Sequence, residues 1–298
     1  MNAASPRIGI VGIGAMGAPI ARNLHARGWP VQVRDIDPAP VAAAAALGIA
    51  ACGSPAALAQ VSDVLVLVVV DAPQIEAVLF GADGVVQAAP QARDEPLGVL
   101  VCSTIAAQDS EDFARRLAPH GIELLDAPIS GGPARAGDGS MSMMRAGAPP
   151  LLARLDPLLR DMAAHRFTIS AKPGDAARTK LVNNLLAGVN LVAAAEALAL
   201  GARLGLDRKV LFDVIAASSG ASWIGRDRMA RALEGDYAPR ARSAILTKDV
   251  GLAIGMAQAA GIDTPLGRAA LDVFEATLAA GMGELDDAAV VRTIWPGF

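Results

Sequence analysis

The most extensive hydrophobic pattern in the chain runs from Pro173 to Leu204 and predicts one long helix. Pro173 and Asp175 supply a breaker and a plausible N-cap at its start, and about thirty residues at about 1.5 Å each span roughly 45 Å. Apart from Asn190 and Glu196, its body is apolar around nearly the whole circumference. In a soluble chain this pattern indicates burial between two masses of protein.

The first turns of this predicted helix are more polar, because Lys180, Asn183 and Asn184 lie at positions i, i+3 and i+4. These side chains share one face within a turn, so an ammonium and an amide can converge on one small molecule. The alternative is a solvated lysine with two asparagines that neighbouring loops satisfy, since polar residues are mostly exposed. The motifs upstream favour the first interpretation, in which these side chains bind a small molecule.

Before the long helix, short apolar strands alternate with alanine-rich helical stretches, which is typical of a parallel, doubly wound sheet. The predicted strands cover residues 8–11, 31–36, 49–52, 64–70, 98–102 and 122–125, followed by extended segments at 140–146 and 166–170. After the long helix the pattern predicts helices only, over residues 207–217, 223–233, 244–260 and 265–280, with a short one from Asp286. We therefore predict an α/β domain over residues 1–170 and an all-α domain over residues 171–298, joined by the long interdomain helix, with the active site in the cleft between them.

The first predicted strand leads into a glycine-rich turn that opens a helix. In a chain with 30 glycines the spacing Gly12-x-Gly14-x-x-Gly17 is weak evidence alone, and the strand and helix around it supply the specificity. The first glycine allows a tight turn, the second lets backbone approach a pyrophosphate, and the third lets helix pack on strand. The predicted dinucleotide loop consists of Gly12, Ile13, Gly14, Ala15, Met16 and Gly17.

The second predicted strand leads to Asp35, where the acidic ribose partner of a dinucleotide is expected. A carboxylate there accepts hydrogen bonds from the adenosine ribose and repels a 2′-phosphate. Ile36 cannot clamp such a phosphate, and Arg34 should point to the other face of its strand. These residues predict that the first domain is a Rossmann domain that binds NAD rather than NADP.

Further ligand-facing residues are expected where other strands end. Val69, Val70 and Thr104 follow two of the predicted strands. The turn Ser130-Gly131-Gly132 can expose successive backbone N–H groups and one hydroxyl, which make a small nest for a carboxylate. A lone glycine turn is more often a matter of backbone geometry.

The composition narrows the classes of partner and location. The formal net charge is −4 and no Lys/Arg cluster is interleaved with aromatic residues, so we expect no nucleic-acid binding. The N-terminus reaches the first strand without the features of a signal peptide, which predicts a cytoplasmic protein. The apolar run 64–70 is too short to cross a bilayer, so we expect no membrane span. Cys52 and Cys102 lack metal or redox spacing, which predicts reduced packing thiols and no metal.

In their order along the chain, these motifs resemble those of the β-hydroxyacid dehydrogenases, typified by 3-hydroxyisobutyrate dehydrogenase. The resemblance covers essentially the whole length. The matching segments are Gly12 to Leu24, Asp126 to Gly132, Gly174 with Lys180 to Asn184, and Lys248-Asp249. Two segments depart from the family pattern: residues 171–176 contain fewer glycines than the usual entry to the catalytic helix, and residues 68–70 read Val-Val-Val in place of Met-Leu-Pro.

The resemblance implies roles for individual residues. Lys180 would be the catalytic acid/base, and Asn184 would hold the substrate. Thr104 and Lys248 would lie near the nicotinamide end of the cofactor, although Lys248 can equally be a surface lysine beside its neighbouring acid. The substrate carboxylate would be bound by Ser130, Gly131 and Gly132.

The implied activity is hydride transfer between NAD(H) and a small 3-hydroxy acid or the matching semialdehyde. Residues 218–223 resemble those of family members that act on more polar acids, such as L-threonate or tartronate semialdehyde, and Trp223 would wall the pocket. A large tryptophan is more often part of a core. Imine reductases and non-catalytic NAD(H)-binding relatives would be expected to lack Lys180. The apolar circumference of the long helix also predicts a homo-oligomer, a dimer or a tetramer, in which the helical domains pack on each other.

Oxidation of an alcohol requires a base that takes the hydroxyl proton. The histidines, His25, His120 and His165, lie away from the proposed site segments, which leaves lysine. A free lysine has a pKa of about 10.4, so Lys180 serves as a base near neutrality only if desolvation or a nearby cation lowers that pKa.

Overall fold

The structure is a computed structural model that describes residues 5–88 and 95–298. It divides into two compact units, one ending at Lys180 and the other running from Leu181 to Phe298. The first residues of the N-terminus, where the sequence predicts no signal peptide, lie outside the described residues.

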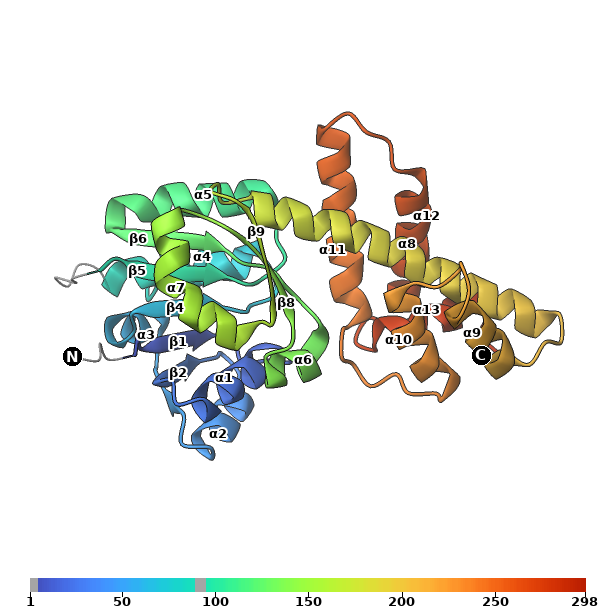
Figure 1. Cartoon of the computed structure of the whole chain (residues 1–298), viewed down its shortest axis with the longest axis horizontal. Coiled ribbons are helices and arrows are strands. Elements are labelled where there is room, and N and C mark those ends of the chain that lie inside the picture. Colours follow the sequence, from blue (N-terminus) through green and yellow to red (C-terminus); the bar gives the residue numbers. More distant parts are fainter. Residues whose placement is uncertain (1–4, 89–94) are drawn as a thin grey trace. The chain divides into compact units, whose positions relative to one another are not determined.

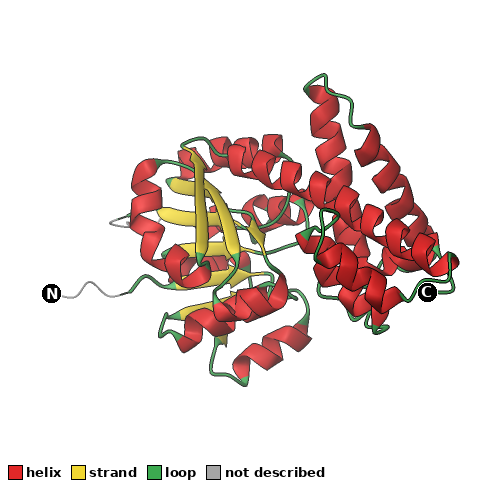
Figure 2. Cartoon of the chain, turned by 45° about the vertical axis from the view of Figure 1, so that its right-hand side comes forward, coloured by secondary structure: helices red, strands yellow, loops and turns green. Residues whose placement is uncertain are grey.

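In the described part of the first unit, nine strands form one sheet in the order β3-β2-β1-β4-β5-β6-β8-β7, with β9 paired to β8. Figure 2 draws the strands in yellow, with helices on both sides of them. Strands β1 to β6 are parallel, β8 runs antiparallel to β6 and β7, and β9 is parallel to β8. The strands are β1 (Ile8–Val11), β2 (Val31–Arg34), β3 (Ala50–Ala51), β4 (Val64–Leu67), β5 (Leu97–Val101), β6 (Ile122–Asp126), β7 (Ile129–Ser130), β8 (Ser142–Ala146) and β9 (His165–Ser170). The predicted doubly wound sheet is confirmed.

Helices cover both faces of this sheet because its central strands are apolar on both sides. In β4, Val64 and Val66 belong to one buried cluster, whereas Leu65 and Leu67 belong to another, as the alternation of a strand requires. The helices are α1 (Gly17–Ala26), α2 (Pro38–Ala45), α3 (Pro55–Val61), α4 (Ala72–Phe80), α5 (Ala107–Leu117), α6 (Gly132–Asp138) and α7 (Pro149–Met162), with short 3₁₀ turns at Val85–Ala88 and Ala118–His120. Side chains of α1 and α7 join the first cluster, and side chains of α3, α4 and α5 join the second.

Two of these helices, α6 and α7, have no counterpart in the sequence-based prediction. The seven residues of α6 include two glycines and a proline, and α7 begins with two prolines and contains Pro157. Glycine and proline are the poorest helix formers, so local propensity hides both helices. Burial of leucines along α7 against the sheet outweighs that propensity.

The long helix α8 (Asp175–Arg203) is present as predicted and is continuous from the first unit into the second (Figure 1). By length and composition alone α8 is also able to cross a membrane. Its residues Leu191, Val192 and Leu198 are instead buried in the core of the helical unit. Gly188 lets another helix approach closely, because a Cβ there would lie 2.6 Å from a methyl carbon of Val250.

The remaining elements of the helical unit also match the prediction to within one or two residues. They are α9 (Arg208–Ala216), α10 (Trp223–Leu233), α11 (Ser243–Ala259), α12 (Pro265–Ala279), a 3₁₀ turn (Asp287–Ala289) and α13 (Val290–Ile294). Their core surrounds Phe274, which is fully buried.

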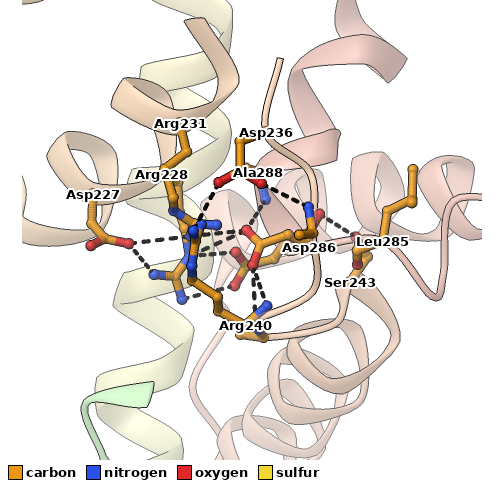
Figure 3. A network of polar contacts seen from close by, with 12 residues as sticks. Asp227, Arg228, Arg231, Asp236, Arg240, Ser243, Leu285, Asp286 and Ala288 are labelled. Carbon is orange, nitrogen blue, oxygen red and sulfur yellow. Dashed lines mark hydrogen bonds and ion pairs between the residues drawn. The ribbon is translucent and has the colours of Figure 1, made fainter. Parts of the chain in front are cut away.

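A buried polar network ties α10 to the segment before α13 (Figure 3). Asp286 has no exposed surface, and its carboxylate accepts a hydrogen bond from Arg231 at 3.0 Å and others from the backbone N–H groups of Arg240 and Ala241. Arg228 of α10 pairs with Asp287 beside it. Burial raises the pKa of Asp287 to about 7, against the opposing charge of Arg228.

We expect Asp286→Ala to lower the free energy of unfolding by about 3 kcal/mol, because it leaves three backbone N–H groups, those of Arg240, Ala241 and Ala288, without their acceptor. It also removes one of the two carboxylates that pair with Arg231. Urea denaturation measures this loss. The control is Asp236→Ala in the same region, which removes a partly exposed pair with Arg240 and should cost much less stability than Asp286→Ala. Equal losses in the two variants would contradict the role given to the buried network.

Candidate functional site

The glycine loop after β1 has a shape that requires glycine at two of its positions. Gly12 has φ of 84°, and a Cβ on it would lie 2.7 Å from the carbonyl oxygen of Val68. A Cβ on Gly17 would lie 1.9 Å from the carbonyl oxygen of Gly12, so the start of α1 packs directly on the loop. A Cβ on Gly14 meets no atom within 4 Å. The loop is therefore closed on its protein side and open at the position where a pyrophosphate would approach.

Asp35 holds this loop to the end of β2. Its Oδ2 accepts the backbone N–H of Ile13 at 2.7 Å, and its Oδ1 accepts the N–H of Asp37 at 2.9 Å. Each carboxylate oxygen has a second lone pair that can accept a ribose hydroxyl. The neighbouring Ile36 is 89% exposed and carries no charge that would bind a 2′-phosphate.

The ends of β4 and β5 lie next to this loop. The hydroxyl of Ser103 donates to the carbonyl oxygen of Val69 at 2.6 Å, which ties the residues after β5 to those after β4. The N–H of Val70 is bonded to Gln74 at 2.9 Å. Strand order reverses between β1 and β4, and in doubly wound sheets ligands bind outside the carboxyl ends of the strands at such a reversal. The predicted cofactor residues of the first unit therefore lie along the edge of the sheet where the parallel strands have their carboxyl ends.

The turn that was predicted to bind a carboxylate follows β6. Ser130 ends β7, where it pairs with Ser142, and Gly131 and Gly132 have φ of 136° and 75°. A Cβ on Gly132 meets no atom within 4 Å, so space for a ligand lies beside it. Backbone N–H groups in such positive-φ turns form concave anion sites.

The start of α8 is held by a residue that the sequence analysis named only as part of a motif. Asp126 ends β6 and is 1% exposed, and its Oδ2 accepts the backbone N–H groups of Gly174 at 2.8 Å and of Ala177 at 3.0 Å. Asp175, the predicted N-cap, instead bonds Ser170 and Arg178 with its carboxylate. The sequence shows only that Asp126 is an acidic residue at the end of an apolar strand. Its partners lie 48 and 51 positions further along the chain, so the local sequence does not reveal the contact.

Burial raises the pKa of Asp126 to about 6, against the hydrogen bonds from Ala177 and Gly174, which lower it. The folded protein therefore keeps a proton that the unfolded chain releases near pH 4, and the free energy of unfolding falls as the pH rises through this window.

Because an asparagine carries no charge, we expect Asp126→Asn to gain stability relative to the wild type as the pH rises from about 4 to about 6, by at most about 3 kcal/mol. Urea denaturation of both proteins at about pH 4 and about pH 8 measures the difference. A difference that is the same at both pH values would contradict the raised pKa.

On α8 itself, the two residues with proposed chemical roles are buried. Lys180 is 6% exposed and Asn184, one turn further, is 8% exposed, whereas Asn183 is exposed. Asn183 donates to the Oδ1 of Asn184 at 3.1 Å. A buried lysine and a buried amide on one helix face are uncommon in a simple core helix.

In the helical unit, Asn184 and Lys248 both contact the carboxylate of Asp249. The Nδ2 of Asn184 donates to the Oδ2 of Asp249 at 2.7 Å, and the Nζ of Lys248 pairs with the Oδ1 of Asp249 at 2.9 Å. Asp249 is buried, and Lys248 is about a quarter exposed. The structure thus joins two predicted site residues through Asp249, which the sequence analysis gave no role.

Trp223 begins α10 and is 55% exposed, so it is not a core residue. The guanidinium of Arg228 lies 5.9 Å from its ring centroid. Its contact with substrate stays a prediction. Within residues 5–88 and 95–298, no group of three or more His, Cys, Asp and Glu side chains is arranged to hold a metal ion.

Comparison with known proteins identifies relatives over the whole chain. Residues 7–171 match the NAD-binding domain family of 6-phosphogluconate dehydrogenase, and residues 174–294 match the NAD-binding domain family of NADP-dependent 3-hydroxyisobutyrate dehydrogenase. An L-threonate dehydrogenase of Cupriavidus necator is 40% identical over 98% of this chain and 97% of its own length. A 3-hydroxyisobutyrate dehydrogenase of Pseudomonas aeruginosa is 34% identical over 90% of each chain.

A solved structure shows the same similarity in three dimensions. The crystal structure of a 3-hydroxyisobutyrate dehydrogenase from Salmonella typhimurium superposes with a TM-score of 0.89 at 38% identity, over 97% of this chain and 99% of that chain. The chain therefore belongs to the β-hydroxyacid dehydrogenase family and is an NAD-dependent oxidoreductase that acts on a CH–OH group.

Proposed function

We propose that this enzyme transfers a hydride between NAD(H) and a small 3-hydroxy acid or its semialdehyde, with Lys180 as the general acid/base. The observation that carries the proposal is the burial of Lys180 and Asn184 one turn apart on α8. Burial removes the amine from water, which is the condition under which a lysine exchanges protons near neutrality.

The proposed chemistry assigns one task to each group. When bound, the nicotinamide accepts or supplies the hydride. In oxidation, the neutral Nζ of Lys180 takes the hydroxyl proton as the carbonyl forms, and in reduction the ammonium returns a proton to the carbonyl oxygen. Asn184 holds the substrate against Nζ, and its amide is itself held by Asp249.

The carboxylate of the substrate would be bound by the hydroxyl of Ser130 and the backbone N–H groups of Gly131 and Gly132. The open space beside Gly132 supports this assignment. A single short nest of N–H groups suits one carboxylate. Lys180 and Asn184 suit a substrate hydroxyl close to that carboxylate, as in a 3-hydroxy acid.

A more polar acid is the second candidate substrate. Among the relatives, an L-threonate dehydrogenase reaches 40% identity, and two proteins named 3-hydroxyisobutyrate dehydrogenase reach 38% and 34%. Trp223, which is 55% exposed and lies outside the core, supports this candidate.

The test is an activity screen that follows NADH absorbance with 3-hydroxyisobutyrate, D-glycerate, L-threonate and tartronate semialdehyde. We expect turnover with at least one of them, and a preference for NAD(H) over NADP(H) because Asp35 repels a 2′-phosphate. Tight NADH binding without turnover of any acid would instead favour a non-catalytic NAD(H)-binding protein. A preference for NADP(H) would contradict the role given to Asp35.

We further propose a homo-oligomer in which α8 of one chain packs against a second copy. Val182 and Leu186 are four residues apart on α8, and Leu200 lies eighteen residues, or about five turns, after Val182, so these three side chains share one face. Each is more than half exposed. Light scattering should give at least a dimer mass, and Leu186→Glu with Leu200→Glu should reduce it to that of a monomer. A monomer mass for the wild type would exclude the proposal.

We also propose that the protein is cytoplasmic and has no membrane span. The packing of α8 residues in the core of the helical unit supports the absence of a span. Recovery of the protein in the membrane fraction of lysed cells would contradict it.

A further inference from the structure

The carboxylate of Asp126 is buried, and the proposed reaction gives it no task. Its Oδ2 accepts two N–H groups from the first turn of α8 and the residue before it, at 2.8 and 3.0 Å. The first N–H groups of a helix have no partner within the helix, and a carboxylate at this end also meets the positive end of the helix dipole. Asp126 therefore performs the capping that Asp175, engaged with Ser170 and Arg178, does not perform.

The bond to Ala177 lies close to Lys180 along the helix. Residues three apart lie on the same helix face, about 4.5 Å apart along the axis. A carboxylate that fixes the N–H of Ala177 therefore fixes the height of Lys180 above the end of β6.

Asp126 is tied equally closely to the proposed carboxylate site. Ser130 follows it by four residues, and the pairing of Ile129 and Ser130 with β8 holds that stretch in place. Asp126 itself is held in the sheet by pairing with Val101 of β5 and Ala146 of β8. One side chain thus joins the strand that leads to the Ser130 turn with the helix that carries Lys180.

Other contacts also hold the start of α8, but they are more exposed. Arg178 pairs with Glu111 of α5 at 2.6 Å, and both side chains are more than two-fifths exposed. Exposed pairs contribute little, whereas removing the acceptor of a buried N–H group costs its full desolvation penalty, whether or not that acceptor is charged.

We infer that Asp126 is a positioning residue, which sets the distance between the Ser130–Gly132 turn and Lys180 by anchoring the first turn of α8 to the end of β6. The inference rests on the proposed function, since it concerns the alignment of the acid/base with a bound carboxylate. In this role the length of the side chain matters more than the charge of its carboxylate.

Three substitutions separate the effect of side-chain length from the effect of charge. Asp126→Asn keeps the length and one acceptor oxygen, Asp126→Glu keeps the charge but is one methylene longer, and Asp126→Ala removes the acceptor. The matched control is Asp207→Ala, which removes another helix cap, the bond to the N–H of Val210 at the start of α9. Oxidation of the best hydroxy acid gives kcat and KM, and fluorescence gives the NADH dissociation constant.

We expect Asp126→Ala and Asp126→Glu to lower kcat by roughly 10- to 100-fold, with NADH affinity within about twofold of wild type, because misplacement by about 1 Å costs this much. Asp126→Asn should stay within about threefold of the wild-type kcat, and Asp207→Ala should leave it unchanged. Hydrogen exchange of the peptide that spans the start of α8 should be faster in the alanine and glutamate variants but not in the asparagine variant.

Two results would overturn the inference: wild-type turnover in Asp126→Glu, or an Asp126→Asn variant as slow as Asp126→Glu. These two variants decide the question even if Asp126→Ala does not fold. A wild-type protein inactive on every acid would overturn the proposed function instead. In that case, equal hydrogen exchange at the start of α8 in the asparagine and glutamate variants would show that Asp126 does not anchor the helix.

Discussion

Lys180→Ala should lower kcat for hydroxy-acid oxidation by roughly two to four orders of magnitude, which is the usual contribution of a positioned acid/base. The hydroxyl proton would then have to leave for water, because the neighbouring amide of Asn184 cannot accept it. NADH affinity should be kept, since Gly12, Gly14 and Asp35 are untouched. Steady-state kinetics and an NADH fluorescence titration measure both quantities.

Lys180→Arg is the matched control for charge. A guanidinium keeps the positive charge but does not give up its proton at any working pH, so this variant should be as slow as Lys180→Ala. If Lys180→Ala retained near-normal turnover, α8 would not be the catalytic element, and Lys248 would be the next residue to replace.

Gly17→Ala should raise the NADH dissociation constant by about 100-fold, because its Cβ would lie 1.9 Å from the carbonyl oxygen of Gly12 and relieving the overlap costs about 3 kcal/mol. The obstacle is backbone, so no side chain can move aside, and the turn must open away from the start of α1. Gly14→Ala tests the same loop from its ligand side. Its Cβ meets no protein atom within 4 Å, so stability should be unchanged while NADH binding weakens by roughly 10- to 100-fold.

Gly53→Ala is the control for this pair, because a Cβ there also meets no atom within 4 Å and the residue lies outside the predicted cofactor loop. We expect its NADH affinity and thermal unfolding to match the wild type. Isothermal titration with NADH and thermal denaturation separate the cases. Wild-type NADH affinity in both Gly14→Ala and Gly17→Ala would show that the cofactor binds elsewhere.

The long helical segments were predicted well from sequence. The helix predicted from 173 to 204 is α8, because a long apolar run follows the breaker at Pro173, and α10 was placed at its observed bounds. Strand ends were less accurate: the apolar run 64–70 leaves the sheet after Leu67, since hydrophobicity continues into the turn at Val68 to Val70.

The candidate site was predictable only where its residues follow one another in sequence. Gly12, Gly14, Gly17 and Asp35 form a recognisable local motif, and the structure gives each a physical reason. The partnership of Asp126 with Gly174 could not be predicted in this way. It depends on how β6 and α8 meet in space, and the carboxylate that caps α8 precedes the helix by almost fifty residues.

The central claim is that Lys180 exchanges the proton of the hydroxy acid, and a pH profile tests it most directly. Single-turnover rates of oxidation with NAD are measured across pH for the wild type and Lys180→Ala, with the hydroxy acid that gives the highest turnover. The wild-type rate should rise with pH to a plateau as the amine loses its proton, and the variant should be slow and lack that rise. A variant that keeps the same pH-dependent rise would contradict the claim.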